Sequence, residues 1–162
     1  MKTCVFAGTF DPITLGHQNV IQKCLEKYQK VLVVVGQNPN KTTFFTESQR
    51  LRMVEKAFEN QKNVQVVAYS SLKDEYAEFL KSQNVTVYVR GIRNQNDLEF
   101  ERLMEQKNKE IYPFIVTEYE YCDEQFASIS STLVRDAIKN GADYTKFVPQ
   151  GVATIIADVL QK

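Results

Sequence analysis

The sequence predicts a single α/β domain, residues 1–162, built on a five-stranded, mostly parallel sheet with helices on both faces. Short apolar runs alternate with helical patterns along the chain, which is typical of repeated strand–helix–strand units. The runs at residues 3–7 and 31–35 contain no charged residue, as in strands that are buried on both faces. Right-handed crossovers then place helices on both faces of the sheet. A chain of 162 residues is long enough for one domain with a sizeable core.

The remaining elements follow from periodicity and from helix-capping signals. Capping-box spacings after Thr46 and after Ser71 each predict the start of a helix. The last long helix before the fifth strand is charged and carries a narrow apolar stripe. We expect strands at residues 63–69, 85–89 and 114–121, and helices around residues 20–28, 46–58, 72–84, 97–111, 130–138 and 152–160.

Composition excludes several classes of protein. Twenty Lys and Arg residues balance twenty Asp and Glu residues, so we expect no nucleic-acid partner, and any anion site must be local. Cys4, Cys24 and Cys122 are an odd number at unrelated spacings, which indicates small buried residues in a reducing cytoplasm rather than disulfides or a zinc site. No apolar run approaches the ~20 residues of a membrane span, and the chain enters a strand at once, so we expect neither a membrane segment nor a signal peptide.

The stretch from Gly8 to His17 is the strongest local signal. It is a turn rich in Gly, Thr, Asp and Pro between a strand and a helix, and it holds the only histidine. Such a turn before a helix N-terminus is how α/β proteins bind anions, so we expect a nucleotide-phosphate site here. Ligands of these sheets bind at the carboxyl ends of the strands, where the segments after four strands should meet. These segments supply cations, glycines and hydroxyl groups but few carboxylates: Lys41, Arg90, Gly91, Arg93 and residues 128–132.

Each of these residues also has a purely structural interpretation. His17 shares a helical face with Val20, so its ring either faces a ligand or packs into the core. Lys41 also fits a solvated loop, residues 128–132 also fit a helix N-cap, and Glu101 also fits a solvated helix face.

Three other chemistries lack their motifs. The sequence has no Walker A motif for P-loop hydrolysis and no Gly-x-Gly-x-x-Gly motif for a dinucleotide. One histidine and scattered cysteines provide neither a zinc cluster nor a Cys-His nucleophile.

Three segments resemble the signatures of known transferases. Residues 9–17 (Thr-Phe-Asp-Pro-Ile-Thr-Leu-Gly-His) resemble the first signature of the nucleotidyltransferase superfamily, and residues 129–135 (Ile-Ser-Ser-Thr-Leu-Val-Arg) resemble the second. Residues 90–93 (Arg-Gly-Ile-Arg) with residues 97–101 (Asp-Leu-Glu-Phe-Glu) resemble an element of the bacterial phosphopantetheine adenylyltransferase family. The three segments occur in family order, and the similarity spans nearly the whole chain.

The resemblance implies a Rossmann-like nucleotidyltransferase domain that converts ATP and 4′-phosphopantetheine into dephospho-coenzyme A and pyrophosphate. It implies Mg²⁺ as cofactor, held mainly by ATP and water, and a hexamer. We also expect coenzyme A to act as feedback inhibitor, because the product and this end product share a pantetheine arm. The resemblance implies His17 as transition-state stabiliser, assisted by Lys41 and Arg90. The implied phosphopantetheine contacts are Thr9, Lys41, Lys73 and Arg90. The implied ATP contacts are Thr9, Phe10, His17, Gly91, Ile92, Arg93, Glu101, Phe126, Ala127, Ser128, Ile129, Ser130, Ser131 and Thr132.

The chemistry of this reaction explains why one histidine suffices. The acceptor is a phosphate monoester, which is largely dianionic at neutral pH and needs no general base. In-line positioning and charge neutralisation at the α-phosphate are then the remaining requirements. The alternative enzyme is a sibling transferase that uses nicotinate mononucleotide, or CTP with a phosphorylated polyol. The alternative class is a nucleotide-binding regulator without turnover.

Overall fold

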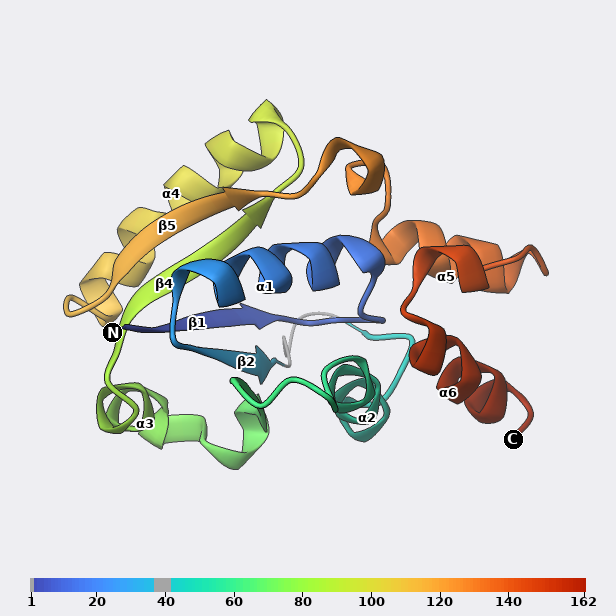
Figure 1. The fold of residues 1–162 in the computed structure, drawn as a ribbon, viewed down its shortest axis with the longest axis horizontal. Helices are drawn as coiled ribbons and strands as arrows, with labels where there is room; N and C mark the ends of the chain where they lie inside the picture. Colours follow the sequence, from blue (N-terminus) through green and yellow to red (C-terminus); the bar gives the residue numbers. More distant parts are fainter. Residues whose placement is uncertain (1, 37–41) are drawn as a thin grey trace.

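The computed structural model describes residues 2–36 and 42–162, which form a parallel sheet flanked by helices (Figure 1). The strand order is β3-β2-β1-β4-β5, and every neighbouring pair is parallel. The order therefore reverses between the two central strands, β1 (Thr3–Gly8) and β4 (Val85–Ile92). The other elements are β2 (Lys30–Val35), β3 (Val64–Ala68), β5 (Val116–Tyr121), α1 (Leu15–Lys27), α2 (Glu47–Ala57), α3 (Tyr76–Ser82), α4 (Gln95–Ile111), α5 (Ser131–Lys139) and α6 (Gln150–Leu160).

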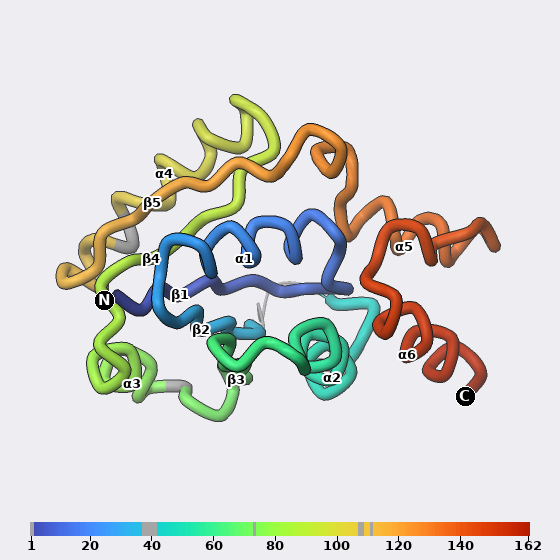
Figure 2. Tube along the Cα trace, in the orientation of Figure 1, coloured from blue at the N-terminus to red at the C-terminus, as the bar shows by residue number. Residues whose placement is uncertain are grey.

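Helices cover both faces of the sheet, which confirms the predicted fold class. Cys4 and Phe6 of β1 face the larger core, to which α1, α2, α5 and α6 contribute. Val5, between them, faces the opposite core, which it shares with α3 and with the turn before β5. The chain trace shows α5 returning to the carboxyl end of β1 (Figure 2), where the Ser131 hydroxyl donates to the carbonyl of Pro12. This return brings the loop after β1 and the start of α5 together at one edge of the sheet.

The start of α3 differs from the prediction. We expected a capping box after Ser71, but the Ser71 hydroxyl donates back to the carbonyl of Ala68 at 2.7 Å. Residues 69–71 and 73–75 form two short 3₁₀ turns, and α3 begins at Tyr76 without a side-chain cap. A serine hydroxyl that bonds its own preceding backbone competes with capping, and this competition is invisible in the spacing alone.

The described residues of the apolar stripe on α4 lie at the surface. Phe100 and Leu103 are 62% and 69% exposed, while Leu98 is the buried one among the side chains of α4 that the structure describes. Val116 on the adjacent strand β5 is also exposed. None of the helices in the described part of the chain is both long enough and apolar enough to cross a membrane.

The cysteines are unpaired thiols in two environments. Cys4 and Cys24 are fully buried, as the sequence predicts, whereas Cys122 is half-buried at the edge of a cavity. Burial raises the pKa of the Cys122 thiol, which therefore stays protonated at neutral pH.

Candidate active site

A cavity of about 410 Å³ lies at the carboxyl ends of β1 and β4, where the strand order reverses. Open α/β sheets bind their ligands at this position, and the volume falls within the range of small-molecule sites. Segments after β1, β2, β4 and β5 all contribute to its wall, as the sequence predicts. The wall includes these sequence-predicted residues: Thr9, Phe10, His17, Arg90, Gly91, Ile92, Arg93, Glu101, Ile129, Ser130, Ser131 and Thr132.

Residues 126–128 do not line the cavity. The carbonyl of Phe126 instead lies over Gly16, where an added Cβ would be 3.6 Å from it. The segment therefore packs its backbone on the start of α1 and supports the wall from behind. Lys41 lies outside the described residues, as does the side chain of Lys73.

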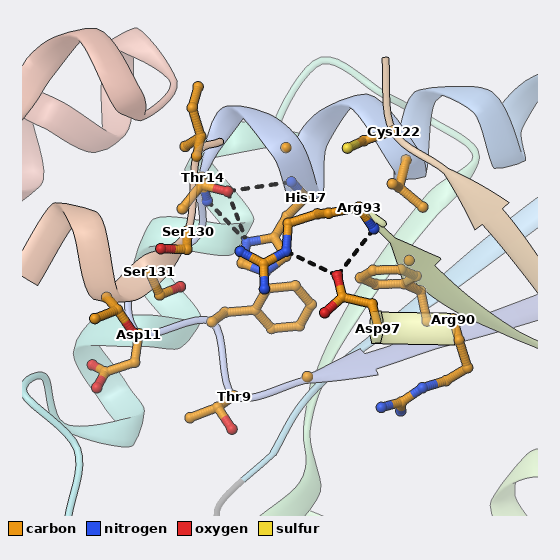
Figure 3. A pocket seen from close by; sticks show the side chains of 18 of the residues that line it. Thr9, Asp11, Thr14, His17, Arg90, Arg93, Asp97, Cys122, Ser130 and Ser131 are labelled. Carbon is orange, nitrogen blue, oxygen red and sulfur yellow. Dashed lines mark hydrogen bonds and ion pairs between the residues drawn. The ribbon is translucent and has the colours of Figure 1, made fainter. Parts of the chain in front are cut away.

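His17 faces the cavity and not the core below it (Figure 3). The backbone N–H of Thr14 donates to Nδ1 of His17 at 3.0 Å, and the Thr14 hydroxyl accepts from the His17 N–H at 3.3 Å. This capping box begins α1, and the imidazole also packs edge-on against the ring of Phe10. Because Nδ1 accepts a hydrogen bond, the proton of the neutral ring lies on Nε2. Burial and the charge of Arg93 lower the pKa of His17 from 6.5 to about 4, so the ring is a neutral donor at pH 7.

The titration of His17 can be followed alone because it is the only histidine. We expect its imidazole NMR signals to titrate near pH 4, with the Nε2–H tautomer present at neutral pH. The unfolded chain binds this proton first, at a pKa near 6.5. The neutral ring of His17 therefore has no effect on stability above pH 6.5, and the free energy of unfolding decreases as the pH drops from 6.5 toward 4. His17→Gln should remove this part of the pH dependence, and a folded-state pKa near 6.5 would contradict the buried, neutral ring.

Three arginines line the cavity, and each has a carboxylate partner, so the expectation of few carboxylates at this edge is wrong. Hydrogen bonds to carboxylates orient the guanidinium groups of Arg90 and Arg93, and all three carboxylates balance positive charge within a neutral chain. Burial alone would lower the pKa of Arg90, but the hydrogen bonds and charge of Glu101 raise it overall. The pairs are Arg90 with Glu101 at 2.6 Å, Arg93 with Asp97 at 3.1 Å, and Arg135 with Asp11 at 3.9 Å.

The hydroxyl groups at the start of α5 are all engaged within the protein. The Ser130 side chain caps the helix, the Ser131 hydroxyl donates to the carbonyl of Pro12, and the Thr132 hydroxyl accepts from Arg135. Backbone N–H groups in the first turn of a helix lack intrahelical acceptors and lie at the positive end of its dipole. An anion at this wall would therefore meet backbone N–H groups together with the O–H groups of Ser130 and Thr132, which only accept in these bonds, while the Ser131 hydroxyl ties the helix to Pro12.

Arg50 is a buried residue that sequence analysis did not single out. Its guanidinium donates to the carbonyls of Thr9 at 2.8 Å, Gly36 at 2.6 Å and Phe45 at 3.2 Å. These bonds join the loop after β1, the end of β2 and the start of α2 beneath the cavity. Burial lowers the pKa of Arg50. The available signal was its place on the apolar face of a helix, three residues before the buried Met53.

Asp11 also joins the loop after β1 to the segment before α2. Its buried carboxylate accepts the backbone N–H groups of Phe44 at 2.8 Å and Phe45 at 2.9 Å. The preceding residue, Phe10, has a φ of 52°. A non-glycine residue in this conformation is strained, and such strain clusters at functional sites. The loop after β1 is thus a rigid support for Thr9 and Phe10 at the cavity wall.

The fold and the site define a nucleotidyltransferase, and residues 5–137 match the cytidylyltransferase-like family. The chain is 36% identical over 159 residues to phosphopantetheine adenylyltransferase of Opitutus terrae, and the match covers 98% of each chain. It is 36% identical over 152 residues to the Phocaeicola vulgatus protein of that name, covering 94% of this chain and 98% of the relative. The corresponding Alkaliphilus metalliredigens protein is 34% identical over 150 residues, covering 93% and 94%. The chain belongs to the phosphopantetheine adenylyltransferase family.

Proposed function

We propose that this chain transfers the adenylyl group of ATP to 4′-phosphopantetheine, giving dephospho-coenzyme A and pyrophosphate. Family membership supports the reaction. One observation carries the mechanism: a neutral imidazole, fixed through Nδ1, is held at a cavity wall that the N-terminus of α5 and three arginines share.

The acceptor phosphate is itself the nucleophile in this reaction. Its second pKa is near 6, so it is already ionised at pH 7, and a histidine that stays neutral need not act as a base. The phosphate oxygen forms a bond to the α-phosphorus of ATP while the bond from that phosphorus to pyrophosphate breaks. His17 would donate its Nε2–H to an α-phosphate oxygen as negative charge increases there.

The two ends of the cavity would hold different phosphates. The N-terminus of α5 and Arg93 would bind the departing pyrophosphate, because helix amides and a guanidinium both stabilise anions. Arg90 lies at the other end of the wall, next to Glu101. We assign the acceptor to that end, with these contacts: Thr9, Lys41, Lys73 and Arg90.

Mg²⁺ would enter the site as its complex with ATP. The carboxylates of the cavity wall already bond arginines or backbone N–H groups. Within residues 2–36 and 42–162, no group of three or more metal-ligating side chains is gathered. We expect phosphate oxygens and water to supply most of its ligands, as this small ion often prefers. The bound ion would neutralise phosphate charge.

A homo-oligomer, which we propose to be a hexamer, is supported by the exposed apolar residues of α4 and β5. Phe100 and Leu103, three residues apart on α4, are 62% and 69% exposed, and Val116 of β5 is 60% exposed. Large apolar side chains that are exposed on neighbouring elements often become buried in a protein interface. Light scattering would give the number of 18.7 kDa chains in solution.

Coenzyme A is proposed as a feedback inhibitor because it contains the same pantetheine arm as the acceptor. Inhibition that is competitive with phosphopantetheine would support this role. We place the reaction in the cytoplasm, because the unpaired thiols Cys4, Cys24 and Cys122 suit a reducing compartment.

Pyrophosphate release tests the function directly. The purified chain is incubated with ATP, Mg²⁺ and phosphopantetheine, and mass spectrometry identifies the second product. We expect pyrophosphate and dephospho-coenzyme A in equal amounts. Parallel reactions with nicotinate mononucleotide, and with CTP plus a polyol phosphate, should release none. Turnover of either of those substrates with none of phosphopantetheine would overturn the proposal, and ATP binding without any turnover would indicate a regulator.

A further inference from the structure

The guanidinium of Arg90 is held by two residues. Its Nε and Nη2 donate to the two carboxylate oxygens of Glu101 at 2.6 and 2.9 Å, and its Nη1 donates to the Tyr88 hydroxyl at 2.9 Å. The guanidinium carbon also lies 5.4 Å from the centre of the Tyr88 ring. A guanidinium has five N–H groups. These bonds use three of them, so one N–H remains on each terminal nitrogen for a ligand.

Strand geometry explains why Tyr88 reaches Arg90. Residues two apart in a strand point to the same face, so both side chains leave β4 on the side of α3. Val87 and Val89 point to the opposite face and pack in the core beneath α1. The Tyr88 ring packs at the core that contains Tyr76, which limits its movement. The tyrosine therefore presents a fixed ring and hydroxyl to the arginine.

Glu101 has two partners in the proposed reaction, whereas Tyr88 has one. By the proposed function Glu101 contacts ATP, so its oxygens are divided between the nucleotide and Arg90 once ATP binds. The Tyr88 hydroxyl accepts only from Arg90 among the described residues, and no proposed substrate contact falls on it. Tyr88 is thus the support of Arg90 that nucleotide binding leaves in place.

We infer that Tyr88 is a positioning residue of the acceptor site: it fixes the Arg90 guanidinium so that the remaining N–H groups meet the phosphate of phosphopantetheine. This inference rests on the proposed function. An arginine that is already ordered loses less side-chain freedom when the ligand binds. Tyr88 therefore increases the affinity for the acceptor. ATP affinity and the rate of the chemical step depend on other groups.

Tyr88→Phe keeps the ring and removes the one hydroxyl that Arg90 bonds. We expect the KM for phosphopantetheine to rise about 5- to 10-fold, the scale for the net contribution of one typical hydrogen bond, because the lost bond acts on the acceptor only through Arg90. The KM for ATP and kcat should each change less than about twofold. The melting temperature should stay within about 2 °C of wild type, because the ring still packs.

Tyr119→Phe is the matched control. Tyr119 pairs with Arg90 across β4 and β5, but its hydroxyl donates to Glu105 of α4. Like Tyr88→Phe, this variant loses one hydroxyl hydrogen bond to a charged side chain near α4. It should leave the KM for phosphopantetheine, the KM for ATP and kcat unchanged.

A double-mutant comparison identifies the route of the effect. Calorimetry measures the Kd for phosphopantetheine in wild type, Tyr88→Phe, Arg90→Met and the double variant, so no turnover is needed. If Tyr88 acts through Arg90, then Tyr88→Phe weakens binding in wild type and has no further effect when Arg90 is methionine. An equal loss in both backgrounds, or a loss shared with ATP, overturns the positioning role. The proposed function fails separately, if wild type releases no pyrophosphate with phosphopantetheine.

Discussion

Replacing His17 with alanine is expected to lower kcat by roughly 10²–10³-fold, the scale for losing one preorganised donor to a developing negative charge. The imidazole is neutral at pH 7, and the Thr14 N–H fixes its Nδ1. Its Nε2–H is therefore a constant donor over the physiological pH range. The KM values for both substrates should change less than about threefold, because the bond strengthens mainly in the transition state. Steady-state pyrophosphate release at varied ATP and varied phosphopantetheine measures both effects.

His17→Gln is the informative comparison. Its amide places an N–H at about the reach of Nε2, so we expect it to recover part of the kcat that alanine loses. His17→Ala loses the bond from the Thr14 N–H to the ring, and losing part of a cap costs about 1 kcal/mol at most. The glutamine of His17→Gln can accept that N–H through its Oε1, as Gln49 does for Thr46 at the start of α2. A wild-type kcat in His17→Ala would show that His17 serves only to cap α1.

Arg50→Met is expected to lower the free energy of unfolding by about 3 kcal/mol or more. Methionine fills much of the same buried volume but donates no hydrogen bond. The carbonyls of the buried Phe45 and of the partly buried Thr9 and Gly36 would then lose a donor. Each buried carbonyl left unpaired costs roughly 1–3 kcal/mol. Urea unfolding, followed by circular dichroism, measures the difference.

Arg52→Met on the same helix provides the control. Arg52 is 60% exposed, and its one ion pair, to Asp158, spans 3.6 Å. Exposed pairs of this kind contribute less than about 1 kcal/mol, so this variant should unfold close to wild type. An Arg50→Met protein as stable as the Arg52→Met protein would mean that the three carbonyls find other donors.

The sequence predicted the order and class of the elements because the signals are local. Strands that are buried on both faces appear in the sequence as uncharged apolar runs, such as residues 31–35 in β2. The capping box of Thr46 and Gln49 likewise marks the start of α2. The error at the start of α3 arose where a local signal had a competing local partner, because the Ser71 hydroxyl bonds the preceding backbone.

The candidate active site also has features that the sequence predicts and features that only the tertiary structure shows. The sequence by itself determined which groups gather at the carboxyl edge of the sheet: a turn with the only histidine, arginines at the end of β4, and a helix N-terminus after β5. It did so because parallel topology places strand ends at one edge, whatever the connecting loops do.

Only the tertiary structure decided how those groups are held. Arg135 donates to the Asp11 carbonyl across 124 positions, and Arg50 to the Thr9 carbonyl across 41. Such bonds depend on backbone atoms, which every residue possesses, so no pattern of side chains predicts them. The direction of His17 is instead set locally. A helical face shared with Val20 left its ring free to enter the core, and a hydrogen bond from the backbone N–H of Thr14, three residues earlier, holds Nδ1 with the ring facing the cavity. The sequence did not show this because the usual capping box has Glu or Gln, not His, at that position.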